Sequence, residues 1–164
     1  MTYKFDAISV VVIDSQPAMV TLIRDVLKML GIRRVSCFND GNRGLEYFLN
    51  YDADILIIDW DLDTMNGIEF TRSIRSSSKN PYVPIIFMTA FSSKQRVTTA
   101  RDSGATEFLK KPFSAEALYK RIQTIIESPR PFVRTQEYFG PDRRAERREP
   151  DYSGPNRRDR EEES

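Results

Sequence analysis

The sequence predicts an α/β fold in which a parallel sheet is covered by helices on both faces. Up to residue 128, short runs of β-branched and apolar residues alternate with segments in which apolar residues recur every three or four positions. Such alternation is typical of strands joined by crossover helices. The strand-like runs cover residues 8–13, 35–38, 55–58, 85–88 and 106–109.

The segment after the first strand run carries the clearest helix signal. Apolar side chains between Met19 and Leu30 follow helical spacing, which predicts one buried face. Pro17 suits the first turn of this helix, and Gly31 suits the left-handed position that ends many helices.

Two later helices differ in how firmly they are anchored. The last helix is expected to begin after a Ser114 cap and to stop before Pro129. The helix before it, residues 94–103, offers only Val97 and Ala100 as apolar contacts. A helix with so few contacts is a candidate for a surface that moves or docks.

Five strands alternating with five helices, joined by right-handed crossovers, give a doubly wound sandwich. A chain that starts with a buried strand fits the flavodoxin-like (βα)5 arrangement, with strand order 2-1-3-4-5. In this order the first and third strands are neighbours, and ligands bind beyond the carboxyl ends of the strands.

Composition divides the chain into two parts. Residues 1–128 carry the α/β pattern, whereas residues 129–164 contain nine Arg and nine Asp or Glu and few side chains that could be buried. We therefore expect one domain over 1–128 and a tail over 129–164 that has no core of its own.

The overall composition also excludes several classes of protein. The 25 basic and 24 acidic residues nearly cancel, which argues against nucleic-acid binding. Without histidine and with Cys37 as the single cysteine, a His-based triad and an internal disulfide are excluded, and a zinc cluster is disfavoured. Apolar runs far shorter than about 20 residues, and the lack of a signal-peptide pattern, predict a cytoplasmic protein that does not contact membranes.

Polar residues follow four of the predicted strands and are expected to meet in one crevice. Asp14 follows the first strand, Asp59 and Asp61 the third, Thr89 the fourth and Lys111 the fifth. Three carboxylates at one place repel each other unless a divalent cation neutralises them, and oxygen ligands favour Mg²⁺. A hydroxyl and an ammonium suit phosphoryl oxygens, and an aspartate beside them suits an acyl phosphate.

Three segments together resemble the receiver domains of two-component response regulators, and among these the single-domain CheY-like proteins. Residues 59–69, DWDLDTMNGIE, are similar to the phospho-acceptor loop of that family, and residues 83–90 and 108–113 match its other motifs. The resemblance covers residues 7–127. It implies a stand-alone signalling protein rather than an enzyme, with at most slow hydrolysis of its own acyl phosphate.

The resemblance implies a role for each residue of the crevice. Asp59 would accept a phosphoryl group from a phosphohistidine on a sensor histidine kinase or phosphotransfer protein. Mg²⁺ would be held by Asp14, Asp59 and Asp61, the last normally through its backbone carbonyl. Thr89 would hydrogen-bond the phosphate and Lys111 would pair with it.

The same resemblance implies how phosphorylation would change the surface of the domain. Phe108 stands where the family has an aromatic ring that turns inward when Thr89 is drawn to the phosphate. The bond before Pro112 would be cis. The output would be a shift of the surface formed by the fourth helix, fifth strand and fifth helix toward an unidentified protein target.

Two residues depart from the family pattern. Ser15 occupies the position of a second acidic residue that usually binds the metal, and Asp63 replaces a proline. A hydroxyl is a poorer Mg²⁺ ligand, so we expect weak metal binding, which the Asp61 side chain could offset. An alternative hypothesis is a pseudo-receiver that acts as an interaction module without phosphorylation.

Two other sites share parts of this pattern. Asp59, Asp61 and Asp63 resemble the start of a calcium loop, but Thr64 and Phe70 replace the glycine and glutamate that such a loop needs. The same aspartates resemble a haloacid-dehalogenase-type phosphatase motif. That family places its nucleophile after the first strand, so this alternative is the weaker one.

The tail contains a repeat with a 14-residue period, Tyr-x-Gly-Pro-x-Arg-Arg. Either it is a docking motif, whose Arg pairs grip carboxylates while the Tyr fills a pocket, or it is a solvated appendage. The docking candidates are Tyr138, Arg143, Arg144, Tyr152, Arg157 and Arg158.

Overall fold

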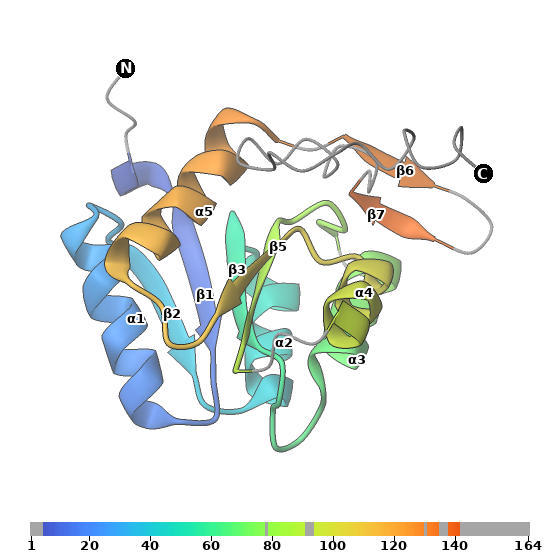
Figure 1. The fold of residues 1–164 in the computed structure, drawn as a ribbon, viewed down its shortest axis with the longest axis horizontal. Helices are drawn as coiled ribbons and strands as arrows, with labels where there is room; N and C mark the ends of the chain where they lie inside the picture. Colours follow the sequence, from blue (N-terminus) through green and yellow to red (C-terminus); the bar gives the residue numbers. More distant parts are fainter. Residues whose placement is uncertain (1–4, 78, 91–93, 130, 135–137, 142–164) are drawn as a thin grey trace, which may run out of the picture.

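The computed structural model describes residues 5–77, 79–90, 94–129, 131–134 and 138–141. Its main sheet has five parallel strands in the order β2-β1-β3-β4-β5, with helices on both faces (Figure 1). This confirms the predicted flavodoxin-like fold. The strands are β1 (Ser9–Ile13), β2 (Arg34–Phe38), β3 (Ile55–Asp59), β4 (Ile85–Thr89) and β5 (Glu107–Lys110). The helices are α1 (Pro17–Met29), α2 (Gly41–Tyr51), α3 (Gly67–Ser77), α4 (Lys94–Ser103) and α5 (Ala115–Glu127), preceded by a 3-10 turn (Phe5–Ala7).

The sheet buries both of its faces because side chains alternate along each strand. In β1, Val10 and Val12 pack with α1 and α5, whereas Val11 and Ile13 pack with α2 and α3. The helix α4 lies beside α3 (Figure 1). Because apolar side chains fill both faces of the sheet, polar functional side chains are left to lie at the strand ends.

Local signals in the sequence set the ends of α1 and α5. Pro17 occupies the first turn of α1, and Gly31 follows that helix with a φ of +92°, a conformation that favours glycine. The Ser114 side chain caps α5 by accepting a hydrogen bond of 3.1 Å from the backbone N–H of Ala117. Among the described residues, no helix is long and apolar enough to cross a bilayer.

A short antiparallel hairpin follows α5 and packs against the sheet end where the strands begin (Figure 1). It consists of β6 (Phe132–Arg134) and β7 (Phe139–Pro141). The rings of Phe132 and Phe139 both meet Tyr82 edge to face, at centroid distances of 5.2 and 5.6 Å. The described part of the tail is therefore an ordered addition to the α/β domain.

Arg75 of α3 joins this hairpin to the loops before β4 and β5. Its guanidinium donates hydrogen bonds to the carbonyl oxygens of Pro81 (2.8 Å), Val83 (2.6 Å) and Gly104 (2.9 and 3.2 Å). The Phe132 ring covers it at 4.9 Å from the guanidinium carbon. Burial lowers the Arg75 pKa to about 10, and the nearby Tyr138 opposes this shift.

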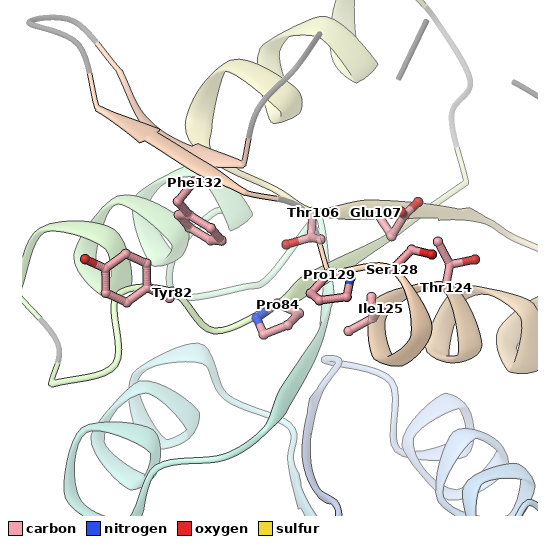
Figure 2. A pocket seen from close by; sticks show the side chains of 9 residues that line it. All are labelled: Tyr82, Pro84, Thr106, Glu107, Thr124, Ile125, Ser128, Pro129 and Phe132. Carbon is pink, nitrogen blue, oxygen red and sulfur yellow. The ribbon is translucent and has the colours of Figure 1, made fainter. Parts of the chain in front are cut away.

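The tail also lines a pocket of about 200 Å³ at the end of the sheet where β4 and β5 begin (Figure 2). Tyr82 and Phe132 lie at one end of this pocket, and Ile125 and Ser128 of the α5 end lie at the other. Pro129, where the tail begins, lines it between them. The chain thus turns back over its own domain directly after α5.

The structure corrects one docking candidate of the tail. Tyr138 is only 8% exposed, and its hydroxyl donates a 2.8 Å hydrogen bond to the Pro141 carbonyl. A Cβ on Gly140 would lie 2.5 Å from the Tyr138 hydroxyl and 3.0 Å from the Gly104 Cα, which explains the glycine. Tyr138 therefore holds the hairpin together instead of filling a partner's pocket. The candidates Arg143, Arg144, Tyr152, Arg157 and Arg158 lie outside the described residues.

Candidate functional site

Three charged side chains meet at the carboxyl ends of β1, β3 and β5, at the end of the sheet away from the hairpin. The Lys111 ammonium donates a 2.8 Å hydrogen bond to Asp14 Oδ2 and lies 3.5 Å from Asp59 Oδ2. All three side chains are largely buried. The predicted meeting of Asp14, Asp59 and Lys111 is therefore present in the structure.

The backbone fixes the two carboxylates at this place. Asp14 directly follows β1, is fully buried, and accepts a 2.8 Å hydrogen bond from the Gln16 backbone N–H through its other oxygen. Asp59 is the last residue of β3, and parallel pairing of β3 with β1 sets it beside Asp14. Both carboxylates thus face one ammonium group.

The Asp14 and Asp59 carboxylates together carry more negative charge than the Lys111 ammonium offsets. Burial raises the pKa of Asp59, and the negative charge of Asp14 raises it further. The Lys111 ammonium and a hydrogen bond from the Asp61 backbone N–H act in the opposite direction without cancelling the shift. Two carboxylates with one lysine leave an excess negative charge that a bound cation would neutralise.

In the part of the chain that the structure describes, the Asp61 side chain is not grouped with Asp14 and Asp59, and the expected ligation through the Asp61 backbone carbonyl stays a prediction. Asp61 is exposed, and its backbone pairs with Asn66 in an isolated bridge. Among the described residues, no three Asp, Glu, Cys or His side chains are grouped closely enough to hold a metal ion. The Asp61 side chain therefore does not complete a three-carboxylate site, and the half-buried Ser15 contributes at most a hydroxyl.

The remaining donor set still fits Mg²⁺. This ion commonly keeps several waters and takes only one or two carboxylates from the protein. Asp14 and Asp59 supply two carboxylates with excess negative charge, and the uncharged Ser15 adds little affinity.

Thr89 and the Lys111–Pro112 bond occupy the neighbouring strand ends. Thr89 is the last residue of β4 and is 7% exposed, and its carbonyl accepts a 2.8 Å hydrogen bond from the Lys111 backbone N–H. The Lys111–Pro112 bond is cis, as the resemblance implies. The strand pairing therefore holds Thr89 next to the residue that carries the ammonium.

An aromatic row runs from the acceptor loop toward β5. Phe87 of β4 meets the Trp60 ring edge to face at 5.3 Å and stacks on Phe108 at 6.3 Å. Trp60 is 9% exposed and therefore belongs to the core rather than to the surface. A Cβ on Gly67 would lie 2.3 Å from the Phe87 ring, which accounts for the glycine of the acceptor loop.

Phe87 is the residue of this site that sequence reasoning missed. It belongs to an unbroken apolar run in β4, where every residue reads as ordinary core. The alternation along the strand puts it on the same face as Ile85, toward α3 and Trp60. Only the three-dimensional arrangement shows that it contacts the rings on both sides.

Comparison with known proteins gives a consistent picture. The response regulator receiver domain family matches residues 10–123. Chemotaxis protein CheY1 of Helicobacter pylori is 30% identical over 116 residues, which are 70% of this chain and 94% of that protein.

Solved structures agree with this match. Chemotaxis protein CheY4 of Vibrio cholerae superposes with a TM-score of 0.68 at 28% identity, covering 73% of this chain and 99% of that one. The receiver domain of sensor histidine kinase PA1611 from Pseudomonas aeruginosa, solved with a magnesium ion coordinated in its active-site cleft, gives a TM-score of 0.68 at 27% identity. That superposition covers 74% of this chain and 98% of that one.

Proposed function

Because the chain belongs to the response regulator receiver domain family, we propose that it is a CheY-like receiver switched by phosphorylation of Asp59. The donor is a phosphohistidine on a sensor histidine kinase or a phosphotransfer protein. The observation that carries this proposal is the Lys111 ammonium between the Asp14 and Asp59 carboxylates. The output is contact with a protein target and not turnover of a substrate.

The chemistry follows from the charges at the strand ends. An Asp59 carboxylate oxygen attacks the phosphorus, the P–N bond to the donor imidazole breaks, and its electron pair returns to the ring nitrogen. Lys111 then pairs with a phosphoryl oxygen, and the Thr89 hydroxyl donates a hydrogen bond to another. Bound Mg²⁺, held by Asp14 and Asp59, supplies positive charge that offsets the carboxylates and the phosphoryl oxygens.

The aromatic row connects this event to the surface. When the Thr89 side chain turns toward the phosphate, the space beside it opens for Phe108, which already stacks on Phe87. The Phe108 carbonyl accepts a 2.8 Å hydrogen bond from Arg121 Nε of α5, so a shift of β5 reaches that helix. Phosphorylation acts only through the state that it stabilises, which makes the switch a population shift.

Trp60 provides a direct test because it is buried beside the acceptor and packs on Phe87. We expect its fluorescence to change on addition of Mg²⁺, and to change again with beryllofluoride or a small phosphodonor. Free N-acetyltryptophanamide titrated with the same reagents serves as the control for general effects of the additives. Steady release of phosphate from an added phosphate monoester would instead indicate a phosphatase and contradict the proposal.

The pseudo-receiver remains the second candidate, and the position of Ser15 favours it. Ser15 is uncharged, and among the described residues no third carboxylate is grouped with Asp14 and Asp59. An unchanged Trp60 signal at saturating Mg²⁺ and phosphodonor would favour this candidate over the phosphorylated receiver.

The substitution Ser15→Asp is expected to tighten Mg²⁺ binding about tenfold or more, because it adds a carboxylate beside Asp14. The measurement is a Trp60 fluorescence titration with Mg²⁺. The control Asn50→Asp adds the same charge on an exposed position of α2 and should leave the affinity unchanged. Equal affinities for wild type and Ser15→Asp would mean that Ser15 does not stand at a ligand position.

A further inference from the structure

A cleft of about 540 Å³ lies between α3, α4 and the hairpin, at the end of the molecule away from Asp59. Three arginines line it: Arg72 and Arg75 from α3, and Arg134 from β6. Asp102 is the one acidic side chain in the lining. Among the described residues, the cleft therefore carries an excess of positive charge.

Two of these arginines are available to a ligand. Arg72 and Arg134 are exposed, and within the described part of the chain neither forms an ion pair. The Arg134 guanidinium lies over the Phe139 ring, at 4.4 Å from its centroid. This stacking holds the side chain in one orientation, so it loses less conformational entropy when it binds an anion.

The third arginine forms a rigid floor. Arg75 is 6% exposed, and its four hydrogen bonds all go to backbone carbonyls. A guanidinium carries five N–H groups, so one of them has no acceptor in these bonds. No carboxylate among the described residues neutralises its charge, and its lowered pKa reflects burial without an acidic partner.

We propose that this arginine cleft is a docking site for an acidic segment of a protein partner. A guanidinium group binds a carboxylate through two parallel N–H···O bonds, and arginine with aromatic neighbours is the composition of interface hot spots. The volume of about 540 Å³ exceeds what one small oxyanion fills, which favours several residues of a peptide. The proposal is independent of phosphorylation at Asp59.

The test uses the full chain and a fluorescently labelled oligoglutamate peptide, with binding followed by anisotropy. Wild type is expected to bind the peptide, and the double variant Arg72→Glu/Arg134→Glu to bind at least about tenfold more weakly. The milder double variant Arg72→Gln/Arg134→Gln should bind the peptide with an affinity between those of wild type and the double Glu variant. A graded loss of this kind is expected for a lost charge contact and not for a folding defect. The Asp59→Asn variant should bind as wild type does.

The matched control is Arg33→Glu/Arg34→Glu, which also reverses two exposed charges, at the start of β2 on the opposite edge of the sheet. This variant should bind the peptide within about twofold of wild type, because long-range charge effects are screened at physiological salt. Equal weakening by Arg33→Glu/Arg34→Glu would overturn the proposal in favour of general attraction. Displacement of the peptide by inorganic phosphate at equal concentration would also overturn it, in favour of a small-anion site.

Discussion

Replacing Asp59 with Asn is expected to lower phosphoryl transfer to this chain by at least about 100-fold. A carboxylate oxygen is the nucleophile that forms an acyl phosphate, and a neutral amide does not replace it. The intact-protein mass after incubation with Mg²⁺ and a small phosphodonor measures the transfer. Asp63→Asn, an exposed substitution in the same loop, is the control and should retain it.

The same Asp59→Asn substitution is expected to stabilise the metal-free fold at neutral pH. The pKa of Asp59 is raised in the folded protein by burial and by Asp14, so folding favours the protonated acid. Stability from this group is therefore present at low pH and is lost as the pH rises above the ordinary value of 3.8. The variant keeps a neutral group at all pH values.

Urea unfolding without metal tests whether Asp59→Asn raises or lowers the free energy of unfolding. The advantage of Asp59→Asn over wild type should be small below the ordinary carboxyl pKa and should grow toward neutral pH. A variant that is less stable than wild type at neutral pH would show that Lys111 outweighs the burial and the Asp14 charge.

Replacing Arg75 with Ala is expected to destabilise the protein by about 3 kcal/mol or more. The substitution removes the guanidinium that donates hydrogen bonds to the carbonyls of Pro81, Val83 and Gly104 and lies against the Phe132 ring. The free energy of unfolding in urea measures the loss. Amide hydrogen exchange should also show faster opening of the hairpin than in wild type.

Arg72→Ala is the matched control because it removes an exposed arginine one turn earlier on the same helix. It should change stability by about 0.5 kcal/mol or less. Arg75→Lys should recover only part of the loss, since an ammonium cannot reproduce the planar fork. Equal effects of Arg72→Ala and Arg75→Ala would mean that water satisfies the loop carbonyls.

Most of the fold could be predicted from the sequence because its signals are local. Apolar runs set the strands, and Pro17, Gly31 and Ser114 set helix ends that the structure confirms. The strand order followed from a general property of doubly wound sheets, and the observed order agrees. These features need no knowledge of distant contacts.

The site was predicted less completely. Parallel strand ends meet at one edge, so the approach of Lys111 to Asp14 and Asp59 could be foreseen. The exposure of Asp61 depends on how its loop turns at the Asn66 bridge. The burial of Trp60 depends on its contact with Phe87, which lies far from it in the sequence. Phe87 in turn packs directly against Gly67, and nothing in the local sequence indicates that contact.

The hairpin was not predicted because a charged segment without its own core reads as a solvated tail. The hairpin is ordered by contacts with residues far away in the sequence. Phe132 packs against Tyr82 and Arg75, and Gly140 lies against Gly104. None of these contacts has a signature within the tail itself.

The most direct measurement maps the phosphorylated residue. The full chain is incubated with Mg²⁺ and a phosphodonor and then treated with borohydride, which reduces an aspartyl phosphate to homoserine. Peptide mass spectrometry should find homoserine at position 59 only in samples that received both reagents. Homoserine at another aspartate, or at none while the donor is consumed, would contradict Asp59 as the acceptor.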